Sequence, residues 1–327
     1  MTDQLRQTEV LRIFRGTSTY ISGAKIAQTL GITRSAVWKI ISRLRAMGYE
    51  FESLPAKGYR LLTLPEFSSE EVRHSLIGLH LFMPENIHFY QSLESTNITA
   101  TEFAAHGAPS GTIVVAEQQV AGRGRLTRVW ESPPGVNIYM SVLLRPDLAL
   151  REITILTLLA GVACASALRG CCDCTVHLKW PNDLLVGKRK LGGILTELRA
   201  DPDRVQFAVI GIGINVNMRK RDMPPSIRMV ATSVSQETGQ AVSRSAILSA
   251  VMHQFDKWLL ILAQHGKRPI LDEWQSLSST IGKTVTIASS NRSLTGVAEG
   301  IDDDGFLIVR LPNGTLTQVH AGDVNHV

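Results

Sequence analysis

The sequence predicts an α+β protein with three folded parts: an N-terminal winged helix-turn-helix, a central α/β domain and a small C-terminal β barrel of the SH3-like kind. Three observations support this. Near the N-terminus two helical patterns flank a Gly turn, from about residue 88 strand and helix patterns alternate, and from residue 284 short strand patterns surround Asp-Gly and Asn-Gly turns. We place the parts at residues 1–65, 88–279 and 280–327, with a linker at 66–87.

The length and composition are those of a globular protein. The chain has 327 residues, of which 44% are hydrophobic, which is enough for two or three domains. No apolar run reaches the ~18 residues that a membrane span needs. The N-terminus is polar rather than signal-peptide-like. We therefore expect a cytoplasmic protein with no membrane partner.

Positive charge is concentrated in the first part. Residues 1–65 carry ten Lys or Arg and four Asp or Glu, a balance of +6, so the other 262 residues lie near −1 against a whole-chain charge of +5. A basic segment on a neutral body suggests a polyanionic partner for that segment alone.

Residues 22–39 predict two helices joined by a tight turn. Ser22 is suited to cap the first helix, Gly31 to end it in the left-handed conformation, and Thr33 to cap the second. In a helix-turn-helix the second helix enters the major groove of DNA. The residues expected to contact DNA are Arg34, Ser35, Trp38 and Lys39. The alternative is a protein-binding helix with a solvated polar face.

The second helix also has an apolar face, because Val37, Ile40 and Leu44 recur at three- and four-residue steps. Residues 49–62 alternate on either side of a Pro and Gly turn, which predicts a β-hairpin wing. Residues 63–69 have the composition of a linker that leads into a short capped helix.

A basic loop with small residues, 117–130, follows a predicted buried strand. It contains Arg123, Arg125 and Arg128 beside glycines. Forked guanidinium donors and accessible backbone N–H groups are suited to close on phosphate. Composition alone favours a solvated basic loop, so the interpretation depends on the rest of the chain.

The other central elements follow from apolar periodicity. Ser95 and Thr96 open a helix, where such residues usually act as caps. Pro181 ends a strand and directs Asn182 and Asp183 into a cleft, although a simple turn is the alternative. The remaining predicted elements are strands at 136–144, 176–179 and 205–216, a hairpin at 184–198, and helices at 153–168, 243–263 and 268–277. The chain has no P-loop motif, and its one Gly-x-Gly lacks the context of a dinucleotide fold.

Three of the four cysteines cluster at Cys171, Cys172 and Cys174, while Cys164 lies in a predicted apolar helix. Three thiols could suggest zinc, but a fourth ligand at the usual spacing is missing and His177 would point along a strand. We expect ordinary reduced cysteines and no metal centre.

Five segments together resemble the family of bifunctional biotin protein ligases that also repress the biotin operon. They are residues 94–97, 117–130, 179–184, 188–195 and 211–217. Five segments in order at family-like spacing are highly specific, and with the flanking parts they cover nearly the whole chain. The resemblance implies that the central domain has the class II synthetase-like fold of biotin and lipoate ligases.

The resemblance also implies a two-step reaction. Biotin and ATP, accompanied by Mg²⁺, give biotinyl-5′-AMP and pyrophosphate. A lysine of the biotin carboxyl carrier protein of acetyl-CoA carboxylase then takes the biotin. The adenylate-bound protein would form a homodimer that binds biotin operator DNA. The alternatives are a pure biotin-sensing regulator with weak or no ligase activity, and a lipoate ligase relative.

The site residues come from the same resemblance. The catalytic residues are expected to be Lys190, Arg123 and Arg125. The biotin-binding residues are expected to be Ser95, Thr96, Asn97, Gln119, Arg123, Gly124, Arg125 and Lys190. The nucleotide-binding residues are expected to be Arg123, Arg125, Arg128, Trp130, Asn182, Asp183, Gly193 and Asn215.

Two points stay open within that assignment. Asp183 could orient magnesium, a ligand donor or the incoming amine. Family loops usually run Gly-Arg-Gly-Arg-Arg-Gly-Arg, whereas this chain has Leu126 and Thr127 in the middle. The change removes one cation and one glycine, which bears on loop mobility and on retention of the intermediate.

Overall fold

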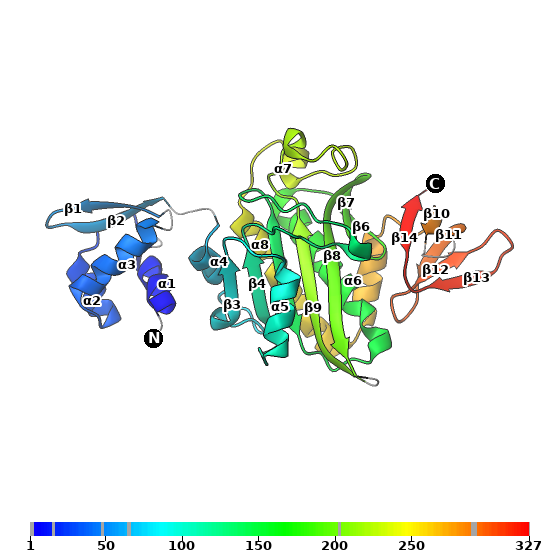
Figure 1. The fold of residues 1–327 in the computed structure, drawn as a ribbon, viewed down its shortest axis with the longest axis horizontal. Helices are drawn as coiled ribbons and strands as arrows, with labels where there is room; N and C mark the ends of the chain where they lie inside the picture. The colour runs from blue at the N-terminus through cyan, green and yellow to red at the C-terminus, as the bar shows by residue number, and fades with distance from the viewer. Residues whose placement is uncertain are drawn as a thin grey trace. The chain divides into compact units, whose positions relative to one another are not determined.

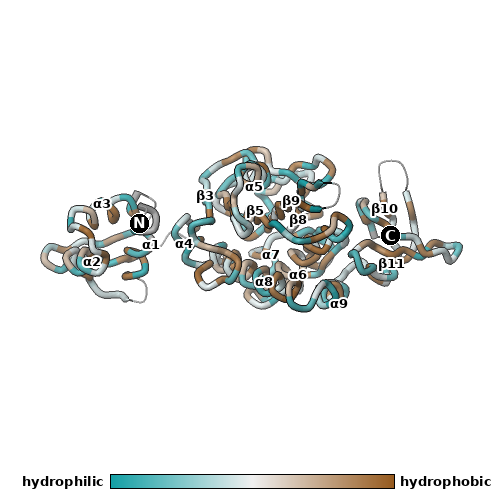
Figure 2. Tube along the Cα trace, turned by 90° about the horizontal axis from the view of Figure 1, so that it is seen from below, coloured by the Kyte–Doolittle hydropathy of each residue, from teal (hydrophilic) through white to brown (hydrophobic). Residues whose placement is uncertain are grey.

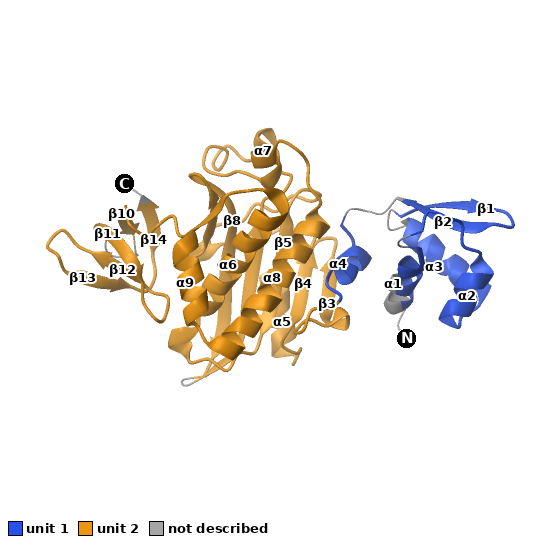
Figure 3. Cartoon of the chain, turned by 180° about the vertical axis from the view of Figure 1, so that it is seen from behind, with its two compact units in different colours: residues 1–77 blue, residues 78–327 orange. Residues whose placement is uncertain are grey.

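The computed structural model describes residues 3–14, 17–46, 49–63, 67–201, 204–288 and 293–326. The chain divides into two compact units, Met1–Ile77 and Gly78–Val327 (Figure 3). Residues 64–66 of the expected linker region lie outside the described residues. The finer division at residues 65, 87 and 279 stays a prediction.

The first unit is a winged helix-turn-helix. It contains α1 (Asp3–Phe14), α2 (Gly23–Leu30), α3 (Arg34–Ala46), the wing strands β1 (Glu50–Leu54) and β2 (Gly58–Thr63), and α4 (Ser69–Ser75) (Figure 1). Ser22 and Thr33 accept backbone N–H bonds of 3.2 Å at the starts of α2 and α3. Gly31 ends α2 with a φ of 63°. The predicted caps and turn are confirmed.

A seven-stranded sheet forms the centre of the second unit. Its order is β3-β4-β5-β9-β8-β7-β6, with antiparallel neighbours except for the parallel pair β3 and β4. The strands are β3 (Ile87–Tyr90), β4 (Thr112–Ala116), β5 (Ile138–Leu144), β6 (Val176–Lys179), β7 (Asp183–Val186), β8 (Arg189–Ala200) and β9 (Val205–Ile214). Strands β4 and β5 are buried along their whole length, as expected for a sheet covered on both faces.

Helices cover both faces of this sheet. One face carries α5 (Thr96–Ala105), and the other carries α6 (Thr154–Cys172) and α8 (Arg244–His265) (Figures 1 and 3). The two remaining helices are α7 (Val234–Thr238) and α9 (Arg268–Leu277). This layered arrangement leaves the loops at the strand ends free to build a site.

Two segments of the described chain, Leu150–Cys172 and Arg244–His265, are long and apolar enough to cross a membrane. Neither segment contains an uninterrupted apolar run of ~18 residues, so the expectation from the sequence is unchanged. The apolar window of the first has a mean hydropathy of 1.8 and is 72% buried inside the protein. Figure 2 shows hydrophobic segments gathered around α6 and the central strands. A core helix meets the same criteria of length and composition as a membrane span.

The C-terminal part is the small β module that the sequence predicts. Its strands pair antiparallel in the order β13-β12-β11-β10-β14. They are β10 (Thr284–Ala288), β11 (Ser293–Ile301), β12 (Leu307–Arg310), β13 (Leu316–Val319) and β14 (Asp323–His326). Gly305 and Gly314 have φ of 82° and 85° at the two predicted turns.

A buried tryptophan joins this module to the α/β body. Trp180 follows β6, and its Nε1 donates to the carbonyl oxygen of Gly305 over 3.1 Å. The φ of 82° at Gly305 favours glycine, and a Cβ atom there would lie 2.7 Å from Cδ1 of Leu158 on α6. The module is therefore packed against the body at a fixed point.

Candidate active site

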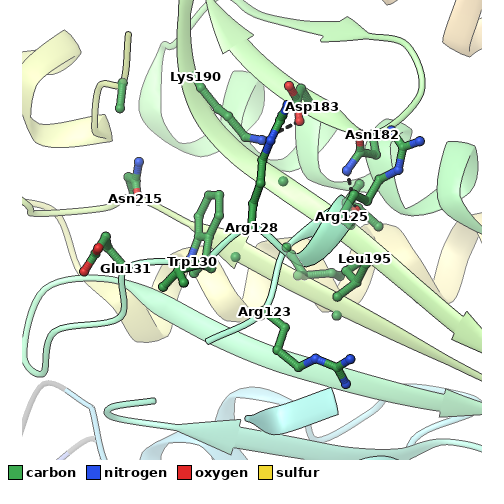
Figure 4. A pocket seen from close by; sticks show the side chains of 18 of the residues that line it. Arg123, Arg125, Arg128, Trp130, Glu131, Asn182, Asp183, Lys190, Leu195 and Asn215 are labelled. Carbon is green, nitrogen blue, oxygen red and sulfur yellow. Dashed lines mark hydrogen bonds and ion pairs between the residues drawn. The ribbon is translucent and has the colours of Figure 1, made fainter. Parts of the chain in front are cut away.

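A cavity of about 340 Å³ lies in the second unit (Figure 4). Its walls come from the start of α5, the 117–131 loop, the β7–β8 hairpin, β9 and the first residues of β14. The structure brings together in its lining all the residues named from the sequence for biotin, nucleotide or catalysis. They are Ser95, Thr96, Asn97, Gln119, Arg123, Gly124, Arg125, Arg128, Trp130, Asn182, Asp183, Lys190, Gly193 and Asn215.

The start of α5 supplies a buried polar wall. Ser95, Thr96 and Asn97 are only 2%, 4% and 3% exposed. Ser95 is the N-cap of α5, yet its side chain makes no capping hydrogen bond with the described residues. The capping role that the sequence favoured for Ser95 was therefore wrong. Its hydroxyl remains available to a ligand.

Ser141 organises this wall from the middle of β5. Its Oγ lies 2.7 Å from Oγ1 of Thr96 and 2.6 Å from Oδ1 of Asn97. The Asn97 amide nitrogen donates to the Leu195 carbonyl oxygen over 3.2 Å and to Oε2 of Glu197 over 2.7 Å. Both amide hydrogens of Asn97 are thus used within the protein, which fixes the orientation of this side chain.

Gln119 connects the basic loop to the same wall. Its Oε1 accepts from the backbone N and Oγ1 of Thr96 over 2.8 and 3.1 Å, and its Nε2 donates to Oγ of Ser132 over 2.9 Å.

A Cβ atom on Gly211 would lie 2.1 Å from Oδ1 of Asn97. Glycine at 211 is therefore required for this packing.

Lys190 begins the cationic side of the cavity. Its Nζ lies 2.6 Å from Oδ1 of Asp183 and 5.5 Å from the centre of the Trp130 ring (Figure 4). A Cβ atom on Gly213 would lie 2.6 Å from the Trp130 ring, so the indole packs directly on the β9 backbone. The Trp130 Nε1 is buried and has no acceptor within the described part of the chain. Such a donor is costly to leave unpaired unless a ligand completes it.

Two of the three loop arginines, Arg123 and Arg128, are paired with carboxylates from other elements. Nη1 of Arg123 lies 3.1 Å from Oε1 of Glu197 on β8. Arg128 forms an ion pair with Asp323, the first residue of β14. With the pair of Lys190 and Asp183, three of the cations in the cavity wall are matched by carboxylates. An anionic ligand would have to replace the carboxylates.

The middle of the loop has a strained backbone. Leu126 and Thr127 have φ of 55° and 61°, a region that costs about 1–2 kcal/mol for a residue with a side chain. The family pattern has glycine at the position of Thr127, which fits this conformation. Arg125 is anchored beside them, because its Nη1 donates to Oδ1 of Asn182 over 3.2 Å. Burial lowers the pKa of the Arg125 guanidinium from its ordinary value.

A second segment, residues 227–231, contributes to the wall beside Asn215. Asn215 donates to the Thr232 carbonyl oxygen over 3.0 Å, and the backbone N of Lys190 donates to the Val230 carbonyl oxygen over 2.8 Å. Met229 and Val230 are nonetheless exposed. The segment is therefore held by its backbone and presents apolar side chains next to the cavity.

The four residues predicted to contact DNA are on α3 in the first unit. Arg34, Ser35, Trp38 and Lys39 are all exposed, and 58% of the Trp38 surface is accessible. Val37 and Leu44 on the opposite side of the helix are fully buried. The structure therefore presents the four residues on one exposed side of the helix that a helix-turn-helix inserts into DNA.

The sequence did not reveal three residues that pair with predicted site residues: Ser141, Glu197 and Asp323. A single serine in the apolar run of β5 was a usable signal, because a buried hydroxyl needs a partner. Glu197 and Asp323 gave none, because lone acidic residues on strands are usually solvated.

The fold and the site define a class of protein: an α/β domain whose cavity has a polar wall and a cationic wall, in one chain with a winged helix-turn-helix. Three family models match the chain. They are the HTH domain at residues 6–60, the biotin/lipoate A/B protein ligase family at 89–215, and the biotin protein ligase C terminal domain at 280–327.

Individual relatives agree with these matches. The bifunctional ligase/repressor BirA of Bacillus subtilis strain 168 is 39% identical over 99% of this chain and 99% of its own. The Escherichia coli K12 protein of the same name is 32% identical over 88% of this chain and 87% of its own. The structure of biotin protein ligase from Aquifex aeolicus with biotin and ATP is 26% identical, covers 74% of this chain and 99% of its own, and has a TM-score of 0.64.

The chain therefore belongs to the family of bifunctional biotin protein ligases and repressors. The predicted family, fold class and ligase and repressor function are confirmed.

Proposed function

We propose that this cavity binds biotin and ATP side by side and joins them as biotinyl-5′-AMP. The observation that supports it most is the division of one cavity into a buried hydroxyl and amide wall and a cationic wall. Ser95, Thr96, Asn97, Gln119 and Gly124 form the biotin side. Ser95 and Gln119 contact the ureido ring, whose donors and acceptors suit a hydroxyl and an amide, while Asn97 keeps the wall in place.

The cationic wall carries the first chemical step. A carboxylate oxygen of biotin forms a bond to the α-phosphorus of ATP, and the bond from that phosphorus to pyrophosphate breaks with its electron pair. Lys190, Arg123 and Arg125 offset the charge that accumulates there. The phosphates replace Asp183, Glu197 and Asp323 as partners of the cations.

The nucleotide occupies the remainder of the same wall. Arg128, Trp130, Asn182, Asp183, Gly193 and Asn215 form the nucleotide side. Mg²⁺ enters with ATP, since it usually binds through one or two carboxylates together with substrate phosphates. No group of three metal-ligating side chains is placed for an ion among the residues that the structure describes. Asp183 is the candidate carboxylate, and it becomes free when Lys190 moves to phosphate.

The second step transfers biotin to a carrier. The neutral amine of a lysine on a biotin carboxyl carrier protein attacks the acyl carbon of the adenylate, AMP leaves with the bonding electrons, and the nitrogen loses one proton to water. A neutral amine will not attack a free carboxylate, so the adenylate provides the leaving group. We place this reaction in the cytoplasm.

Incubation with biotin, ATP-Mg²⁺ and a carrier domain tests the ligase proposal. We expect pyrophosphate release followed by a carrier whose mass rises by one biotinyl group. Biotin binding without pyrophosphate release would favour the pure regulator instead. Lipoate that competes with biotin on equal terms would favour a lipoate ligase relative.

The winged helix-turn-helix supports a second proposed role, repression controlled by the adenylate. The adenylate orders the basic loop and promotes a homodimer, and two α3 helices then contact a two-fold biotin operator. Arg34, Ser35, Trp38 and Lys39 make the contacts. Operator binding measured by fluorescence anisotropy should tighten when biotin and ATP are added together. An affinity that does not change with ligand would contradict the coupling.

A further inference from the structure

Two adjacent cysteines at the end of α6 lie outside the lining of the cavity. Cys171 is exposed, Cys172 is half-buried, and their Sγ atoms are 3.2 Å apart. Free cysteines usually behave as small buried apolar residues, as the fully buried Cys164 of the same helix does. Packing therefore explains Cys164 and leaves the solvent-accessible pair unexplained.

The two thiols are hydrogen-bonded to each other and not joined as a disulfide. The hydrogen bond from Cys172 lowers the pKa of the Cys171 thiol to about 7. A thiol with a pKa near neutrality is partly in the nucleophilic thiolate form at physiological pH. The same hydrogen bond raises the pKa of Cys172, so Cys171 is the thiol that attacks first, and the second sulfur atom lies 3.2 Å away.

The number of sulfur atoms limits what this pair can bind. The described chain has no group of three His, Cys, Asp or Glu side chains placed around a metal ion, whereas structural zinc is held by four ligands. A monosubstituted trivalent arsenical needs only two. We propose that Cys171 and Cys172 form a vicinal dithiol site for trivalent arsenicals and similar soft thiophilic centres that have two exchangeable positions.

The binding reaction needs no oxidant or reductant. Phenylarsine oxide in water carries two hydroxyl groups on arsenic. Each thiol sulfur forms a bond to arsenic, each arsenic–oxygen bond breaks, and each thiol proton leaves with a hydroxyl as water. The second bond forms within the first adduct, where linkage raises the effective concentration of the partner to about millimolar. Two thiols therefore retain arsenic far longer than one.

The test uses the full-length folded protein. It is reduced with a phosphine, freed of the reductant, and mixed with phenylarsine oxide in the presence of excess 2-mercaptoethanol. Native mass spectrometry should show one phenylarsenic group per chain, removed by 2,3-dimercaptopropanol and not by the monothiol. Cys171→Ser and Cys172→Ser should each weaken retention by on the order of 10²–10⁴-fold. Cys174→Ala is the matched control and should retain the wild-type level.

Two results would overturn the proposal. One is a wild-type protein that holds no arsenical under these conditions. The other is a Cys171→Ser or Cys172→Ser variant that binds as well as the wild type, which would assign capture to another pair such as one that includes Cys174. Thermal melts followed by circular dichroism establish that each variant is folded, and the exposed position of Cys171 makes its substitution the mildest.

Discussion

Replacing Lys190 by methionine tests the chemistry at the centre of the proposed site. Methionine keeps most of the aliphatic length and removes only the charge. The ammonium group lies 2.6 Å from Oδ1 of Asp183, and the two side chains are 36% and 20% exposed. In the reaction this cation moves to the α-phosphate, so the variant loses both an ion pair and a contact to the transition state.

The two losses differ in size. A partly exposed ion pair contributes about 0.2–1 kcal/mol, which changes a binding constant by about fivefold at most. One preorganised donor to a developing charge contributes about 3–4 kcal/mol, or about 10²–10³ in rate. Lys190→Met should therefore slow adenylate formation by about 10²–10³ while biotin affinity changes by less than about fivefold.

The assay is single-turnover pyrophosphate release at saturating biotin and ATP-Mg²⁺. Lys188→Met is the matched control, because Lys188 is exposed in the same hairpin and does not line the cavity. The double variant with Asp183→Asn should stay slow. If it regains the wild-type rate, Lys190 serves only as the counterion of Asp183, and an unaltered rate in Lys190→Met alone would equally refute the reasoning.

Three further predictions address the rest of the molecule. Ser141→Ala should lower the free energy of unfolding by about 1–3 kcal/mol, because the buried Oδ1 of Asn97 loses its donor; an unchanged urea midpoint would contradict the network. Asp323→Asn should tighten ATP binding by up to about fivefold, because phosphate no longer competes with the Asp323 carboxylate for Arg128. Weaker ATP binding by calorimetry would contradict the replacement of Asp323 by phosphate. Lys39→Ala should reduce the slope of log operator affinity against log salt by about 0.9, the value for one lost phosphate contact; an identical slope would place Lys39 away from DNA.

Elements set by neighbouring residues were predictable from the sequence. Ser22, Gly31 and Gly305 each depend on hydrogen bonds or dihedral angles within a few residues, and a local pattern encodes them. The ion pair of Arg128 and Asp323 joins positions 195 residues apart, and no local pattern carries that information.

The residues that hold the site side chains in place also depend on contacts between distant segments. The resemblance pointed to the side chains that line the cavity. It did not reveal Ser141 and Glu197, which form hydrogen bonds with Asn97. Their roles arise only when β5, β8 and α5 come together, because a hydrogen bond between distant segments depends on tertiary packing. Hydropathy has a separate limit, because a core helix such as α6 and a membrane span can share the same length and composition.

The contact between Trp180 and Gly305 limits how this protein can be shortened or recombined. A chain cut before the C-terminal module would expose a large indole to water and leave its N–H without the carbonyl that accepts it. A truncated chain could then lose activity because the core around Trp180 is disrupted, so the loss would not show that the module takes part in catalysis. A chimera that exchanges the module with that of a relative must therefore keep the tryptophan and the glycine turn as a matched set.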